Sequence, residues 1–282
     1  MTFNQDENRA HLPKTSDTAK NLEMFSLERL SIDLSNRCSK QCDFCYNHSH
    51  SVGNTIWMPQ EIIGLLKDCA ANGLQAVSLG GGEPFEYEGV FEIISAMTPL
   101  LFVSVTTNGI PLRNEETWGR LLQHKPDKIH FTIHNPEDEE DLANALSLIG
   151  ALRKEGIRTG INLLVSSDKI PQAKHLFRRL ERSGISREEV ILIPRKYALQ
   201  PTPSEMAEVA GNKPFQSPSC LTQCKPSERF ASISWDKKVN FCSYSPSKVP
   251  LPEISYDGII NALRSINFKI CQNLAYINSE TK

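Results

Sequence analysis

Between residues 30 and 193, short β-rich runs alternate with longer segments of helical periodicity. The β-rich runs cover residues 30–34, 76–79, 102–107, 128–133, 159–165 and 189–193, and the helical segments cover 59–72, 88–98, 114–124, 138–155 and 169–182. Strands that alternate with helices of this length predict βαβ units and a parallel sheet. The pattern therefore predicts an α/β fold.

The predicted strands have one apolar face and one small or polar face. In the first strand, Leu30, Ile32 and Leu34 alternate with serine and aspartate, and in the fourth, Thr132 and His134 alternate with apolar residues. Successive strand residues face opposite sides of a sheet, and a sheet covered by helices on both faces reads as a continuous apolar run. We expect a curved sheet with helices outside and a polar ligand inside; a plain parallel sheet with tolerated polar positions is the alternative.

Unusual residues follow the ends of the predicted strands. The run CSKQCDFC (38–45) follows the first strand, GGGEP (80–84) the second, TTNG (106–109) the third and HNP (134–136) the fourth. Ligands of parallel sheets bind at the carboxyl ends of the strands. These four loops are therefore expected to meet at one site.

Three cysteines, Cys38, Cys42 and Cys45, lie within eight residues of one another. Thiolates this close suit one soft metal centre. A structural zinc site closes with four ligands, whereas a [4Fe–4S] cluster held by three thiolates keeps one iron open. The local set of three favours the cluster.

The CxxxCxxC run, with Phe44 before its last cysteine, and the GGEP that follows strand two resemble the signatures of the radical S-adenosylmethionine (SAM) enzymes over residues 30–195. The resemblance implies a partial (β/α)6 barrel in which Cys38, Cys42 and Cys45 hold a [4Fe–4S] cluster and SAM chelates its open iron. It also implies that Phe44 lies against the adenine. It further implies that the loop that binds the amine of SAM consists of Gly81, Gly82, Glu83 and Pro84.

Other rim residues are weaker candidates for contacts to SAM or substrate. They are Thr107, Asn108, Thr132, His134 and Asn162, and each has the alternative of a satisfied buried polar group. The family pattern Gly-x-Ile-x-Gly-x-x-Glu at strand five is not matched by residues 160–166.

A second group of cysteines follows a proline-rich stretch over 194–219. Residues 230–235 and 239–242 predict a hairpin that returns Cys242 to Cys220 and Cys224, and a helix over 256–268 precedes Cys271. This arrangement resembles the twitch or SPASM appendages of one branch of the family. It implies an auxiliary [4Fe–4S] cluster on Cys220, Cys224 and Cys242, with Cys271 as fourth ligand or bystander. A tetrahedral zinc site on the same cysteines is the alternative.

The 282 residues, 39% of them hydrophobic, suit a core plus an appendage. We expect a polar N-terminal leader (1–26), a barrel core (27–195), and a linker with a twitch-like subdomain (196–282). A net charge of −2 gives no pull toward nucleic acid or anionic membranes, and no apolar run approaches the roughly 20 residues that span a bilayer. A cytoplasmic protein with reduced thiols is expected.

The family resemblance implies reductive cleavage of SAM to a 5′-deoxyadenosyl radical that removes hydrogen from a substrate, with an external one-electron donor of the flavodoxin or ferredoxin type. Members with such appendages commonly modify ribosomally made peptides, so a peptide crosslink or epimerisation is the first expectation. A radical oxidoreductase or epimerase acting on a small molecule, such as an aminocyclitol, sugar or cofactor precursor, is the alternative. A non-catalytic iron–sulfur or zinc protein is the alternative from another class.

Overall fold

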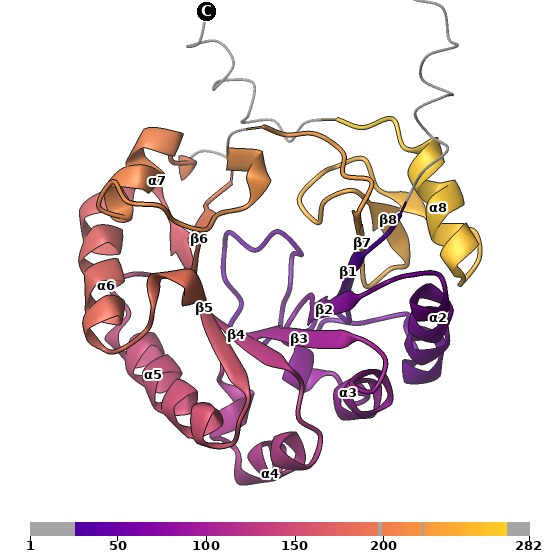
Figure 1. Cartoon of the computed structure of the whole chain (residues 1–282), viewed down its shortest axis with the longest axis horizontal. Coiled ribbons are helices and arrows are strands. Elements are labelled where there is room, and N and C mark those ends of the chain that lie inside the picture. Colours follow the sequence, from indigo (N-terminus) through magenta and orange to yellow (C-terminus); the bar gives the residue numbers. More distant parts are fainter. Residues whose placement is uncertain (1–25, 197–198, 222, 270–282) are drawn as a thin grey trace, which may run out of the picture.

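A computed structural model describes residues 26–196, 199–221 and 223–269 (Figure 1). Its strands are β1 (Arg29–Asp33), β2 (Ala76–Gly80), β3 (Phe102–Thr107), β4 (Lys128–Ile133), β5 (Arg158–Val165), β6 (Val190–Pro194), β7 (Phe230–Ile233), β8 (Lys238–Asn240) and β9 (Val249–Pro250). Its α-helices are α2 (Pro59–Ala71), α3 (Val90–Met97), α4 (Glu115–Gln123), α5 (Glu139–Lys154), α6 (Ile170–Arg182), α7 (Pro203–Val209) and α8 (Tyr256–Ser265).

The predicted α/β core is confirmed, with element ends that shift by one or two residues. Strands β1 to β6 are parallel neighbours in chain order. Figure 1 shows the strands as an arc with α2 to α6 around its outside. The curved sheet expected from strand parity is therefore the observed architecture, a partial (β/α)6 barrel.

The core lies between the sheet and the outer helices. Leu30, Ile32 and Leu34 of the β1 region are fully buried there, as the apolar parity predicted. Helix α2 begins with Pro59 at its first turn, where a missing backbone N–H costs little. It buries one stripe that includes Cys69, whose thiol pKa burial raises to about 12. Cys69 is thus a core residue.

The predicted C-terminal hairpin is present, but it does not stand apart from the barrel. Strand β7 pairs in parallel with the free edge of β1, placing Phe230 opposite Arg29, and β8 and β9 continue the same sheet antiparallel. Among the described strands, this makes a run of seven parallel strands, β6-β5-β4-β3-β2-β1-β7. Sequence reasoning missed this extension because it joins segments some 200 residues apart.

Two further predictions differ from the structure in detail. The proline-rich stretch that reads as a linker contains α7, because Thr202 caps its amino end, Pro203 opens its first turn and Glu205 closes a capping box. The predicted helix over 256–268 ends at Ser265. The N-terminal leader up to residue 25 and Cys271 lie outside the described residues. In the described part of the chain, no helix is long and apolar enough to cross a bilayer.

Candidate active site

One cavity of about 280 Å³ collects most of the residues that the sequence singled out. Of the predicted site residues it is lined by Cys38, Cys42, Phe44, Cys45, Gly81, Gly82, Glu83, Thr107, Asn108, Thr132, His134 and Asn162. Inward-facing strand positions such as Ser31 and Thr106 complete its floor. Pro84 is instead buried at the start of a 3-10 turn and is not among the lining residues. The three cysteines of the first run therefore share one cavity with the glycine loop.

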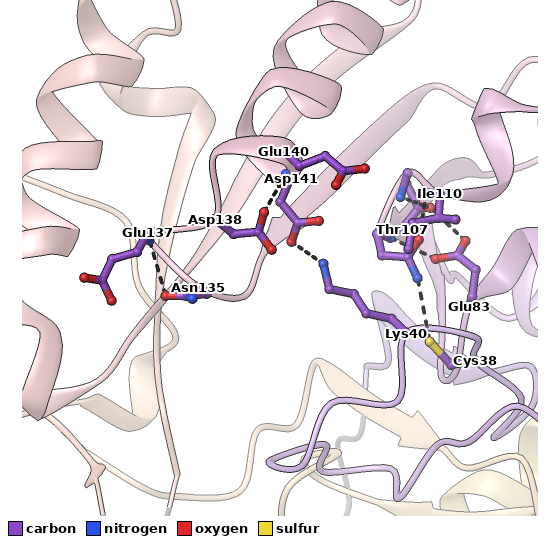
Figure 2. Close-up of polar contacts among 12 residues, drawn as sticks. Cys38, Lys40, Glu83, Thr107, Ile110, Asn135, Glu137, Asp138, Glu140 and Asp141 are labelled. Atoms are coloured by element: carbon purple, nitrogen blue, oxygen red, sulfur yellow. Dashed lines mark hydrogen bonds and ion pairs between the residues drawn. The ribbon is translucent and has the colours of Figure 1, made fainter.

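The cysteine loop is held by contacts to three neighbouring segments. The Asn108 side-chain amide lies 3.6 Å from the Cys38 sulfur, and Ser39 donates from its hydroxyl and its backbone N–H to Glu86 at 2.6 and 3.1 Å. Lys40 forms an ion pair with Asp141 near the amino end of α5 (Figure 2). Figure 2 shows Lys40 and Cys38 reaching from the same loop toward different partners. The loop geometry is thus set by protein contacts on several sides.

Gly81 and Gly82 are required by this same packing. Gly81 has φ +108, a left-handed conformation that favours glycine, and a Cβ there would lie 2.7 Å from the Ser35 carbonyl oxygen. A Cβ on Gly82 would lie 1.9 Å from the Arg37 carbonyl oxygen. The backbone N–H groups of Gly82 and Glu83 donate to the Ser35 and Arg37 carbonyls at 2.7 and 2.8 Å. The glycine loop and the cysteine loop therefore interlock backbone against backbone.

The Glu83 carboxylate ties the glycine loop to the loop that follows β3. It accepts from the Thr107 hydroxyl at 2.7 Å, the Asn108 backbone N–H at 2.8 Å and the Phe85 backbone N–H at 3.1 Å. The side chain is 1% exposed, and burial raises its pKa to about 7 although these donors favour the charged form. All of these hydrogen bonds join Glu83 to other parts of the protein. The Thr107 hydroxyl likewise bonds within the protein, because it also accepts from the Gly109 N–H.

A polar wall lies beside Phe44. The ring of His134, from the end of β4, packs 5.9 Å from the Phe44 ring. Burial lowers the pKa of His134 to about 4, so the imidazole is neutral at pH 7. Its buried Nδ1 has no hydrogen-bond partner among the described residues. A neutral ring with an unsatisfied nitrogen at a cavity wall is a group ready for a ligand.

Sequence reasoning missed two cations in the cavity wall, Arg195 and Lys196, which follow β6. The Arg195 guanidinium lies 5.0 Å from the Phe44 ring centroid, and Lys196 Nζ lies 5.5 Å from that of Tyr244. They stand where the strand pattern ends and proline-rich sequence begins, which reads as a linker. One signal could have found Arg195: Ile193 faces inward, and the residue two positions later shares that face of an extended chain.

A buried acid and two tyrosines form a second missed group. Tyr46, directly after Cys45, donates to Asp33 at 3.1 Å, and its ring lies 4.8 Å from Tyr244. Burial raises the pKa of Asp33 to about 6 and that of Tyr46 well above its usual range. Both tyrosines line the cavity. They place the segment after Cys242 against the segment after Cys45.

The C-terminal cysteines lie beside the cavity rather than in its lining. Cys220, Cys224 and Cys242 are half-buried, and Lys196 Nζ lies 3.2 Å from the Cys220 sulfur. None of the described cysteines forms a disulfide. Among the residues that the structure describes, no three His, Cys, Asp or Glu side chains are grouped as ligands of a single metal ion.

Comparison with known proteins gives a family match across the barrel. The family model "Radical SAM superfamily" matches residues 32–171. A probable GTP 3′,8-cyclase of Methanocella arvoryzae is 34% identical over 29% of this chain and 27% of its own length. The GTP 3′,8-cyclase of Clostridium perfringens is 33% identical over 45% of this chain and 40% of its own. The chain thus spans about a quarter to two fifths of the length of these curated relatives.

Solved structures match the fold over more of the chain. Streptococcus suis SuiB bound to S-adenosylmethionine has a TM-score of 0.63 at 15% identity, covering 80% of this chain and 63% of that chain. Native anSMEcpe with bound AdoMet and Cp18Cys peptide has a TM-score of 0.60 at 14% identity, covering 84% and 80%. At such low identity the likeness shows the fold. Together with the family model and the two motifs at one cavity, it establishes that the chain belongs to the radical SAM superfamily and is a radical SAM enzyme.

Proposed function

We propose that Cys38, Cys42 and Cys45 hold a [4Fe–4S] cluster and that the adjoining cavity holds SAM. When bound, the two supply reductive cleavage of SAM to methionine and a 5′-deoxyadenosyl radical, which takes a hydrogen atom from the substrate. Two observations support the fit: three thiols face one cavity, and the buried Nδ1 of His134 lacks a partner among the described residues. The observation that carries the proposal is the shared cavity of the cysteine run and the glycine loop.

The protein's own work is to hold and shield these groups. Asn108 donates toward the Cys38 sulfur, an interaction that tunes iron–sulfur centres. The Lys40–Asp141 pair fixes the loop between Cys38 and Cys42. On the cavity floor, Thr132, His134 and Asn162 offer hydrogen bonds to the polar parts of SAM or substrate, while Phe44 offers an apolar face that excludes water.

For the substrate, we propose a small molecule before a peptide. Two cations, Arg195 and Lys196, stand in the cavity wall, and cations there suit a small substrate with an anionic group. Curated relatives that share part of the barrel are named GTP 3′,8-cyclases, which act on a nucleotide by their names. A ribosomally made peptide remains the second candidate, because the SuiB fold, matched over 86% of this chain, is solved with its precursor peptide SuiA.

We further propose an auxiliary [4Fe–4S] cluster on Cys220, Cys224 and Cys242, with the zinc site as its competitor. The Lys196 ammonium lies 3.2 Å from the sulfur of Cys220, one of the proposed ligands. Metal analysis after anaerobic reconstitution separates the cases. About eight irons per chain indicate two clusters, and about four irons with one zinc indicate the competitor.

The decisive experiment is anaerobic reconstitution followed by reduction in the presence of SAM. We expect 5′-deoxyadenosine and methionine, and we expect a variant with Cys38, Cys42 and Cys45 all replaced by Ala to form neither while keeping the auxiliary metal. Reconstituted wild type that contains iron but forms no 5′-deoxyadenosine would instead indicate the non-catalytic iron–sulfur protein. Adding deuterated nucleotides or deuterated peptides to the reaction then shows which class transfers deuterium to 5′-deoxyadenosine.

A further inference from the structure

Some charged side chains of the cavity wall have a partner of opposite charge or hydrogen-bond donors, and others have no carboxylate of the described chain in ion-pair distance. Lys40 pairs with Asp141, and the Glu83 carboxylate is occupied by its donors from Phe85, Thr107 and Asn108. Among the described residues, no carboxylate lies within ion-pair distance of Arg195 or Lys196. Within the part of the chain that the structure describes, the cavity therefore presents two positive charges without a carboxylate partner in an ion pair.

The two cations are held in place by other contacts. The Arg195 backbone N–H donates to the Val165 carbonyl at 2.7 Å, and its guanidinium packs over Phe44 at 5.0 Å, a cation–π geometry. Lys196 is 9% exposed and packs over Tyr244 at 5.5 Å. The pKa of the Asp168 carboxyl is lowered, first by the hydrogen bond from the Ser166 hydroxyl and also by the charge of Arg195. This carboxylate is exposed and forms no ion pair with Arg195 among the described residues. The cations are thus preorganised in the wall rather than free in solvent.

Removing a cation from water without a carboxylate partner costs desolvation free energy. Binding of an anion beside the cation offsets that cost. The Lys196 ammonium has three N–H donors and directs one of them at the Cys220 sulfur, 3.2 Å away, so two donors can serve a ligand. Arg195 keeps a planar fork suited to two oxygens of one group. Because both residues follow β6, they stand across the sheet from the glycine loop after β2, separated by three strands in the sheet order.

From this arrangement we propose that Arg195 and Lys196 form an oxyanion subsite for the substrate, which therefore carries a phosphate or carboxylate group. The proposal rests on the proposed function and narrows its substrate class. The subsite anchors the substrate by its charged end, so that the rest of the molecule extends over the cavity toward the cysteine loop. Anchoring of this kind fixes the position of the bond that reacts.

The test is calorimetric titration of the reconstituted, SAM-saturated enzyme with inorganic pyrophosphate and, separately, with succinate. Saturation with SAM removes the SAM carboxylate as a competing source of the signal. We expect saturable binding in the range of about 1 mM or tighter, weakened about tenfold or more by Arg195→Met or by Lys196→Met. Preference for pyrophosphate identifies a phosphorylated substrate, and preference for succinate a carboxylated one.

The matched controls are Arg182→Met and Lys154→Met, which remove exposed cations from α6 and α5. They should bind as the wild type does. Lys196→Arg keeps the charge and should retain affinity within about threefold, which guards against loss by misfolding. Arg195→Lys keeps the charge without the planar fork and should bind between the wild type and Arg195→Met. Each variant should keep the wild-type iron content.

Three results would overturn the subsite: no saturable binding to the wild type, equal weakening by the controls, or a tenfold loss of SAM affinity in Arg195→Met with pyrophosphate binding unchanged. The last would assign the cations to SAM. The proposed function is tested by a separate measurement, the amount of 5′-deoxyadenosine that the wild type forms. Binding of pyrophosphate without 5′-deoxyadenosine would reject the enzyme reaction and leave the anion site standing.

Discussion

Replacing Gly82 by Ala tests why the glycine loop contains glycine. The added Cβ would lie 1.9 Å from the Arg37 carbonyl oxygen and 2.6 Å from its carbon. Real Cβ contacts below 3.0 Å are essentially absent from proteins, so the Arg37 carbonyl must retreat by at least about 1.1 Å. Arg37 directly precedes Cys38, and its carbonyl accepts from the Glu83 N–H at 2.8 Å. The substitution therefore disturbs the cysteine loop itself.

The expected cost has two parts. Overpacking against backbone costs about 1–3 kcal/mol, and loss of the buried Glu83–Arg37 hydrogen bond about 1 kcal/mol more. We expect Gly82→Ala to lower the free energy of unfolding of the metal-free protein by about 2–4 kcal/mol, measured by urea titration. Because Cys38 moves with Arg37, iron bound per chain after reconstitution should fall as well.

Two other glycines serve as controls. Gly64, within α2, has no atom within 4 Å of an added Cβ, so Gly64→Ala should stabilise by about 0.5–1 kcal/mol. For Gly80, which lines the cavity, the nearest contact is Asp33 Oδ1 at 3.9 Å, so Gly80→Ala should leave stability unchanged. If Gly82→Ala kept wild-type stability and iron content and lost only SAM affinity, the glycine would serve the ligand and the packing argument would be refuted.

Three more perturbations follow from the site. Asn108→Asp replaces the donor near Cys38 with an anion, so the reduction potential of the cluster should fall in a spectroelectrochemical titration; an unchanged potential would contradict the contact. A double-mutant cycle on Lys40→Ala and Asp141→Ala should give a coupling of about 1 kcal/mol or more, because the side chains are 16% and 12% exposed, and additive effects would argue against the pair. The pKa of Asp33 is raised from 3.8 to about 6, so its folded-state stabilisation is complete below pH 3.8 and is lost as the pH rises through 6. Asp33→Asn should therefore match the wild type near the acid end and exceed it at pH 8 by up to about 3 kcal/mol in urea titrations, whereas a constant difference across pH would reject the shift.

Much of the barrel was predictable because its signals are local. Strand parity predicted which residues face inward, and Thr132, His134 and Asn162 line the cavity as expected. The spacing of Cys38, Cys42 and Cys45 predicted one shared site without any knowledge of distant contacts. Such patterns repeat every two or four residues, so a short stretch of sequence contains them.

The partners of the site residues were not predictable, because they come from other loops. Glycine in the GGEP run suggested close approach to a ligand, yet the nearest atoms to Gly81 and Gly82 belong to residues 33–37. Glu83 was expected at SAM, and its carboxylate also binds Thr107 and two backbone N–H groups. A motif specifies residue types, whereas the atoms that surround them depend on how loops meet.

The sequence by itself determined the alternating strands and helices, the inward polar face and the cysteine run, because each follows from local periodicity or spacing. Only the tertiary structure decided that β7 joins the free edge of β1 and that Arg195 and Lys196 enter the cavity wall. The physical reason is that an open strand edge accepts any extended segment that reaches it. Which segment arrives, and which charges come with it, depends on the path of the whole chain.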